Sequence, residues 1–148
     1  MKRSLRSRGF TLVELVIVLL IIAALMTIAL PGYRDHLLRT RRAVASSELL
    51  AVLARQEQFY IEHKRYAASL VALGYPESPF ALDGEGNTWP ALAPEGVYLI
   101  DISMLSQGFA LHAQPQRAQS ADRACGTLTL NWQGLKTVTG NQSAARCW

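Results

Sequence analysis

The stretch GFTLVELVIVLLIIAALMTIALPGY, from Gly9 to Tyr33, decides how the rest of the chain is organised. Between Phe10 and Leu30 it carries a single charged side chain, Glu14. A helix of this length spans about 30 Å, which is the thickness of a bilayer's hydrocarbon core. Basic residues and no acids precede it, which predicts a cytoplasmic N-terminus and an exported remainder. These basic residues are Lys2, Arg3, Arg6 and Arg8.

Two simpler kinds of segment compete with this interpretation. A cleaved secretory signal has an apolar core of about 7–15 residues followed by small residues, whereas this run is longer and ends at Pro31 and Gly32. An ordinary membrane anchor explains the apolarity and the basic flank. It does not explain Glu14, because a carboxylate in lipid costs about 2.5–3.5 kcal/mol. Glu14 lies near the cytoplasmic end, where an anchor could tolerate it by snorkelling, so this alternative stays open.

The run Gly9-Phe10-Thr11-Leu12-Val13-Glu14 after a short basic leader resembles the type IV prepilin signature. The resemblance implies that a prepilin peptidase cuts between Gly9 and Phe10 and methylates the new amino terminus of Phe10. The apolar helix is then kept. It also implies that Glu14 aligns each incoming subunit by pairing with a neighbouring subunit's terminal amine. Such a pairing makes physical sense, because a buried carboxylate becomes tolerable once it has a cationic partner.

Charge and composition bound the possible functions. The 148 residues suit one domain plus a membrane helix. The formal net charge is +4, from 15 basic and 11 acidic residues, and four of the basic residues lie in the leader. After cleavage the two signs balance, so a generic basic surface for DNA is not predicted. A near-neutral surface suits a subunit that has to assemble.

Cys125 and Cys147 are the two cysteines. An even number in an exported domain predicts a disulfide, which would stabilise the fold by about 3 kcal/mol. A zinc site would need more ligands, and His36, His63 and His112 are scattered along the sequence. No phosphate-binding loop or hydrolase motif is present, so we expect no cofactor, no metal and no catalytic residues.

A helical pattern resumes beyond Pro31 and Gly32. We expect one helix from about Phe10 to Glu62, kinked where the proline removes a hydrogen bond. Its second half is amphipathic and needs a sheet to cover its apolar face, which is formed by Leu38, Ala45, Leu49, Val52 and Phe59.

A basic cluster, Arg39, Arg41 and Arg42, follows the apolar segment on the exported side. Such a run is most often a solvated helix face or pairs with acids of a neighbouring molecule. It could also bind lipid head groups or DNA phosphates, which requires several convergent cations.

The middle of the chain, Pro76 to Gly96, is rich in proline and glycine and is predicted to be a loop. Within it, the run Asp83 to Asn87 loosely resembles a calcium loop but lacks the required glycine and the bidentate glutamate, so calcium binding is not favoured.

Four strands are predicted after this loop, at Val97–Leu105, Phe109–Ala113, Thr127–Trp132 and Leu135–Thr139. The third has the clearest alternation, which should turn Leu128, Leu130 and Trp132 toward the helix. His112 is expected to be an exposed structural residue, because no nucleophile or acid partner is identifiable for it.

The C-terminal pattern adds to the resemblance. Cys125-Gly126-Thr127-Leu128-Thr129-Leu130-Asn131, followed by Gly134 and Cys147-Trp148, is similar to the disulfide-bounded region of PilE-type minor pilins. The resemblance implies an α+β type IV pilin fold, in which a long, kinked N-terminal helix packs on an antiparallel sheet of about four strands. It divides the chain into a leader (1–9), a transmembrane and filament-core helix (10–32) and an exported globular domain (33–148).

The function implied is that of a structural subunit, a minor pilin, which supports pilus biogenesis, twitching motility and adhesion. The subunit would wait in the inner membrane with its globular domain in the periplasm and would then enter an extracellular pilus. Its partners would be other major and minor pilins, the prepilin peptidase, the inner-membrane assembly machinery and a pilus-tip adhesin. The alternatives are a type II secretion pseudopilin, a DNA-binding competence pilin and, least favoured, an anchored periplasmic enzyme.

Overall fold

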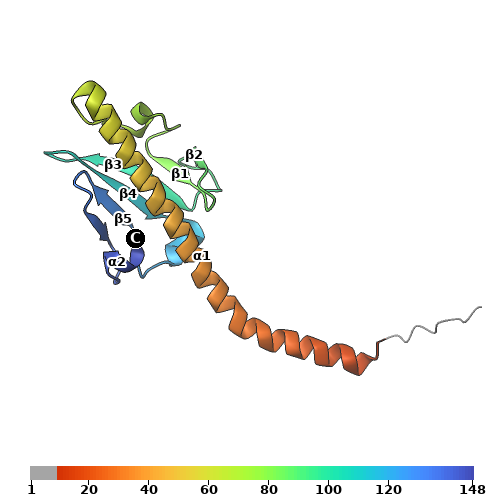
Figure 1. Cartoon of the computed structure of the whole chain (residues 1–148). Coiled ribbons are helices and arrows are strands. Elements are labelled where there is room, and N and C mark those ends of the chain that lie inside the picture. The colour runs from red at the N-terminus through yellow and green to blue at the C-terminus, as the bar shows by residue number, and fades with distance from the viewer. Residues whose placement is uncertain (1–9) are drawn as a thin grey trace, which may run out of the picture. The chain divides into compact units, whose positions relative to one another are not determined.

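The computed structural model describes residues 10–148, and the chain divides into two compact units. The first unit ends at His36 and the second comprises Leu37–Trp148. Gly9 and the rest of the leader lie outside the described residues, so the predicted cleavage site is not placed. Every strand that the structure describes belongs to the second unit, where residues 37–63 of the long helix pack against the sheet (Figure 1).

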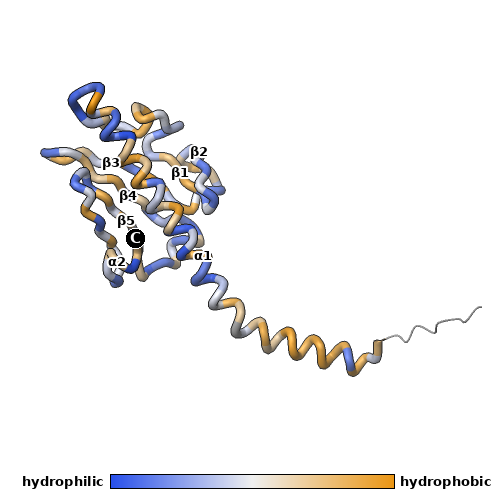
Figure 2. Tube along the Cα trace, viewed as in Figure 1, coloured by the Kyte–Doolittle hydropathy of each residue, from blue (hydrophilic) through white to orange (hydrophobic). Residues whose placement is uncertain are grey.

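Helix α1, Leu12–His63, is continuous through both units, as the sequence predicted. In the second unit it turns Ala45, Leu49 and Val52 inward, and none of these side chains is exposed to solvent. This confirms the apolar face predicted from spacings of four and three residues. Figure 2 shows the part of α1 in the first unit as almost continuously hydrophobic, whereas the part in the second unit alternates. The helix stops at Lys64, whose φ of 55° is left-handed.

The second unit contains a six-stranded antiparallel sheet with the strand order β2-β1-β3-β4-β5-β6 (Figure 1). Four of the strands correspond to the four predicted ones. The strands are β1 Phe80–Leu82, β2 Thr88–Pro90, β3 Tyr98–Met104, β4 Phe109–Pro115, β5 Leu128–Asn131 and β6 Lys136–Val138.

The stretch Pro76 to Gly96 was wrongly predicted to be loop throughout, because β1 and β2 lie within it. All three residues of β1 are buried, so the alternation by which a strand is recognised is absent. β2 ends in Pro90, which is tolerated because β2 is an edge strand with β1 as its neighbour. The predicted architecture is therefore confirmed, with two more strands than expected.

The core lies between α1 and the face of the sheet that alternation predicted. Leu128 and Leu130 are fully buried, as are Tyr98 and Ile100 on β3. Trp132 is partly buried and packs against the same core, as expected. Alternate residues on the strands face the other way, so the sheet has one apolar face and one more polar face.

Three short helices were not predicted, namely η1 Leu70–Leu73, η2 Arg117–Ala121 and α2 Ala144–Cys147. Each has four or five residues, which is too short to show a helical period. Two of them matter for the sites described next, because η2 contacts α1 and α2 carries Cys147.

Candidate functional site

The N-terminal turn of α1 has a cap that the sequence analysis overlooked. The hydroxyl oxygen of Thr11 accepts a hydrogen bond from the backbone N–H of Glu14 at 3.2 Å. Threonine and glutamate three residues apart form the pattern of a capping box, and an acid in the first turn is stabilised by the helix dipole. The observed bond uses the backbone of Glu14, and its carboxylate stands in the first turn, where the helix dipole favours an acid. The T-x-x-E spacing was the available signal.

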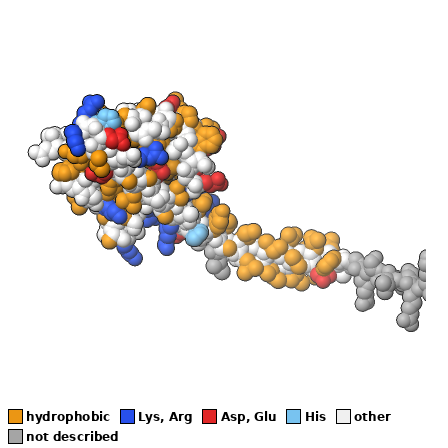
Figure 3. All heavy atoms as spheres, turned by 45° about the horizontal axis from the view of Figure 1, so that its top comes forward, with side chains coloured by type: hydrophobic (Ala, Val, Ile, Leu, Met, Phe, Trp, Pro, Cys, Tyr) orange, Lys and Arg blue, Asp and Glu red, His pale blue; other side chains and the backbone are white. Residues whose placement is uncertain are grey.

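The first unit exposes an apolar surface. The described large apolar side chains between Phe10 and Leu30 are 44% to 83% exposed. Figure 3 shows hydrophobic side chains covering the visible face of this segment. Such a surface needs lipid or another chain to cover it. Pro31 and Gly32 lie inside the continuous helix α1, and the predicted kink there stays a prediction.

A helix that spans a membrane has to meet requirements of length and of mean hydropathy. Within residues 10–148, no single helix meets them alone. The parts Leu12–Thr27 and Gly32–His63 of α1 meet these requirements only when they are taken together.

The basic cluster does not present three cations together. Arg39 is exposed, and the Arg41 side chain lies against the β1–β2 turn, 3.3 Å from where a Cβ on Gly84 would stand. Arg42 is turned inward, with only 12% of its side chain exposed. Phosphate binding by all three residues as one site is therefore not supported by this arrangement.

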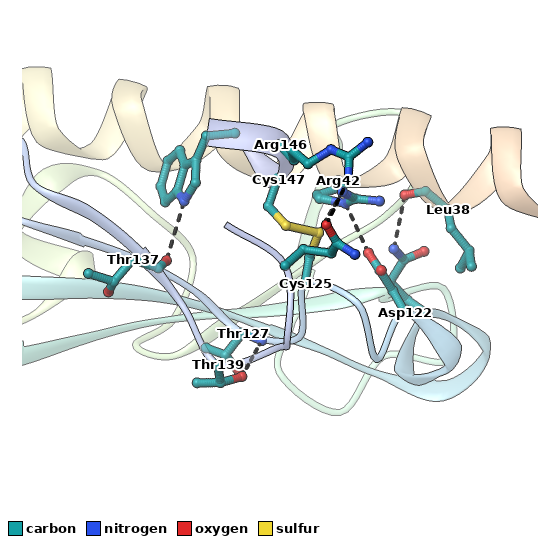
Figure 4. Close-up of a disulfide and its surroundings, with 12 residues drawn as sticks. Leu38, Arg42, Asp122, Cys125, Thr127, Thr137, Thr139, Arg146 and Cys147 are labelled. Carbon is teal, nitrogen blue, oxygen red and sulfur yellow. Dashed lines mark hydrogen bonds and ion pairs between the residues drawn. A yellow bond between two sulfur atoms is a disulfide. The ribbon is translucent and has the colours of Figure 1, made fainter. Parts of the chain in front are cut away.

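Arg42 forms a buried ion pair with Asp122, the residue that follows η2. The two atoms, Arg42 Nε and Asp122 Oδ2, lie 2.9 Å apart, and only 3% of the aspartate side chain is exposed (Figure 4). Neither atom meets the angular requirements of a hydrogen bond, so charge rather than alignment holds the pair together. The pair connects α1 to the segment before the third predicted strand, which periodicity in a single sequence could not reveal.

Gln119 on η2 strengthens the same connection. Its side-chain N–H group donates to the backbone oxygen of Leu38 on α1 and to the hydroxyl of Tyr98 on β3, each at 3.1 Å. Gln119 and Tyr98 are both fully buried. Burial raises the pKa of Tyr98 to about 12, although the hydrogen bond from Gln119 opposes this shift. A buried polar network therefore fixes η2 to the start of the second unit's helix.

The predicted disulfide between Cys125 and Cys147 is present, and its two Cα atoms are 5.7 Å apart (Figure 4). Both residues are buried. Arg42 Nη1 donates to Cys125 Sγ at 2.6 Å, so the ion pair and the disulfide contact each other. Trp148 donates its indole N–H to the Thr137 carbonyl at 3.3 Å, which places the residue after Cys147 against the edge strand β6.

His112 has a nucleophile beside it after all, contrary to the sequence analysis, and is half-buried rather than exposed. Its Nε2 lies 2.8 Å from the Ser103 hydroxyl, and its Nδ1 lies 3.2 Å from the Thr129 hydroxyl. A catalytic histidine is usually oriented by a carboxylate at the second nitrogen. Here a hydroxyl occupies that position, and Asp101, opposite His112 on β3, accepts from the N–H of Ile102. The cluster cross-links three strands.

The Asp83 turn joins β1 to β2. Asp83 accepts hydrogen bonds from the backbone N–H groups of Glu85 and Asn87, from the Asn87 amide and from the Trp89 indole, at 2.8–3.0 Å. Burial alone would raise the pKa of Asp83, but these hydrogen bonds outweigh it and lower the pKa to about 2. Both carboxylate oxygens serve the turn, which gives the sequence a role other than a calcium loop.

Two family profiles match the chain. The profile described as "Type IV minor pilin ComP, DNA uptake sequence receptor" matches residues 31–129. The profile described as "Prokaryotic N-terminal methylation motif" matches residues 4–30. Together they extend over both structural units.

Individual proteins give a consistent result. A fimbrial protein of Pseudomonas aeruginosa is 38% identical over 87 residues, or 55% of this chain and 56% of its own length. The type IV major pilin protein PilA of Myxococcus xanthus (strain DK1622) is 37% identical over 70 residues, or 47% of this chain and 32% of its own. The chain thus spans about half the length, or less, of these curated relatives. A solved type IV pilin from Shewanella oneidensis is 25% identical, with 75% of this chain and 97% of that chain covered and a TM-score of 0.49.

Proposed function

The chain belongs to the family described as type IV minor pilin ComP, DNA uptake sequence receptor, and from this membership we propose that it is a structural subunit of a type IV pilus. The observation that carries the proposal is the exposed apolar surface of the first unit, from Phe10 to Leu30. A surface of this size is covered by lipid before assembly and by the same segments of neighbouring subunits in a filament. The helix then serves as membrane anchor and as filament core in turn.

Processing and assembly follow from the N-terminal motif. A prepilin peptidase would cut after Gly9 and methylate Phe10, and the inner-membrane assembly machinery would extract the subunit. Glu14 would pair with the terminal amine of a neighbouring pilin, because a charge among apolar helices is stable only with a partner. The assembled filament would serve twitching motility and adhesion.

The alignment role of Glu14 is tested with three variants, because Glu14 also belongs to the helix cap. Glu14→Gln keeps a residue that can complete a capping box but removes the charge, whereas Thr11→Ala removes the cap and keeps the charge. We expect Glu14→Gln and Glu14→Ala to be nearly absent from sheared pili and Thr11→Ala to be incorporated. Normal incorporation of Glu14→Gln would refute the alignment role.

N-terminal sequencing of the protein from sheared pili tests the proposal as a whole. The mature chain should begin at methylated Phe10, and any other first residue would refute the processing scheme. A gene deletion separates the pilus from a secretion pseudopilus. Lost enzyme secretion with normal twitching would assign the subunit to the secretion system instead.

A second function, DNA binding, is favoured by the description of the family profile. The separated positions of Arg39, Arg41 and Arg42 mean that other surface cations would have to contribute. Binding of the full chain in detergent to short duplex DNA should weaken steeply as salt rises, because phosphate contacts release counterions. No detectable binding at low salt, or binding without this salt dependence, would remove the second function.

A further inference from the structure

Three exposed arginines of the second unit lie close in sequence to residues of the Arg42 network, and we call Arg39, Arg123 and Arg146 the arginine rim. Arg39 directly follows Leu38, whose carbonyl accepts from η2. Arg123 directly follows Asp122, which pairs with Arg42. Arg146 precedes Cys147, whose disulfide partner contacts Arg42. Arg146 Nη1 donates to the Gln142 side-chain oxygen at 3.2 Å, and Figure 4 shows Arg146 and Arg42 in the surroundings of the disulfide. The three rim residues come from α1, from the segment after η2 and from α2.

The carboxylates nearest to the rim along the chain are Asp35, one helical turn before Arg39, and Asp122. Asp122 is buried and already paired with Arg42. No residue of the rim forms an ion pair within residues 10–148. Other acids of the second unit contact different parts of the fold, namely Glu48, Glu57, Glu77, Asp83 and Asp101. Counting only these four arginines and Asp122, the formal charge is +3, and it is +2 when Asp35 is included.

The position of the rim along the chain indicates its partner. Arg39 follows Leu30, the end of the exposed apolar run, by only nine residues. When the apolar run lies in a bilayer, that short connection holds the rim at a high effective concentration near the head groups. Guanidinium groups bind phosphate oxygens through paired hydrogen bonds, and basic segments beside a membrane helix are attracted to anionic lipids.

We infer that the arginine rim binds the phosphates of anionic phospholipids while the subunit is anchored in the membrane. The contact holds the exported unit against the bilayer surface, and the rim is released when the subunit leaves the membrane. This inference rests on membrane anchoring and not on incorporation into a pilus. DNA carries the same phosphate chemistry but lacks the tether, so lipid is the favoured partner.

The test uses the full chain in lipid nanodiscs that contain a gadolinium-labelled head group. Paramagnetic broadening of amide signals reports which residues lie close to the bilayer surface. In discs with phosphatidylglycerol, we expect strong broadening at η2 and α2, at least threefold more than in phosphatidylcholine discs. Salt at about 0.5 M should remove most of this difference, because the Debye length then falls to a few ångströms.

Two matched double variants identify the residues responsible. The double variant Arg123→Gln, Arg146→Gln should abolish the dependence of the broadening on phosphatidylglycerol. The control is Lys64→Gln, Arg65→Gln, which removes two exposed cations beyond the other end of α1 and should leave that dependence unchanged. Equal broadening in both lipids, or equal loss in both variants, would overturn the inference. Stronger binding of the rim to duplex DNA than to lipid at equal phosphate concentration would also overturn the inference, and it would assign the rim to nucleic acid. Normal incorporation of the rim variant into pili supports the inference, because the contact serves only the anchored subunit.

Discussion

Replacing Arg42 with Met should destabilise the second unit by about 3 kcal/mol, the lower end of the range for breaking a buried ion pair. The methionine keeps an apolar stem of similar length but leaves the Asp122 carboxylate, 3% exposed, without its cation. The lower end of this range applies because Arg42 and Asp122 are not aligned as a hydrogen bond. In addition, 12% of the arginine side chain reaches solvent.

Asp122→Asn should cost less, about 1–2 kcal/mol, because the remaining arginine keeps its sulfur contact and some solvent. The double variant carries no uncompensated buried charge. We therefore expect its loss to be smaller than the sum of the two single losses by about 1–2 kcal/mol, which is the interaction energy of the pair.

Urea unfolding of the full chain in detergent micelles measures these losses without the ionic screening that guanidinium would add. The reporters are Trp89, Trp132 and Trp148, which all lie in the second unit. Arg39→Met, an exposed neighbour on the same helix, is the control and should stay within about 0.5 kcal/mol of the wild type. If the loss of the double variant equals the sum of the two single losses to within about 0.5 kcal/mol, the ion pair is energetically unimportant and the reasoning is refuted.

Three further predictions concern the second unit. Replacing Cys125 and Cys147 together with Ala should lower the free energy of unfolding by about 3 kcal/mol in the same assay, because it frees a loop of about 22 residues. Lys64→Gly should raise the free energy of unfolding by about 0.5–1 kcal/mol, since glycine adopts the left-handed conformation without strain. A lower free energy of unfolding would contradict this prediction. The pKa of Asp83 is lowered from 3.8 to about 2, so its stabilisation is present above about pH 4 and is lost as the pH falls through 2. The Trp89 indole N–H resonance should report this loss, and Asp83→Asn should remove its pH dependence.

Features with long or clear periodicity were predictable from the sequence. The apolar face of α1 repeats over several turns, and the alternation of β5 placed Leu128 and Leu130 in the core. The cysteine pair was predictable because the sequence offers one possible pairing and predicts an exported location. Short elements were missed, because three buried residues of β1 or five residues of η2 show no period.

The sequence by itself determined the architecture, because a long apolar helix followed by an amphipathic one requires both a nonpolar environment and a covering sheet. Tertiary structure alone decided which charged side chains are paired and which are exposed. Arg39, Arg41 and Arg42 are neighbours in sequence but point in different directions, since successive helical residues are about 100° apart. Folding paired Arg42 with an aspartate 80 residues away and placed the arginine against Cys125 of the disulfide. A pairing of that kind depends on how η2 and α2 pack, and no local pattern encodes it.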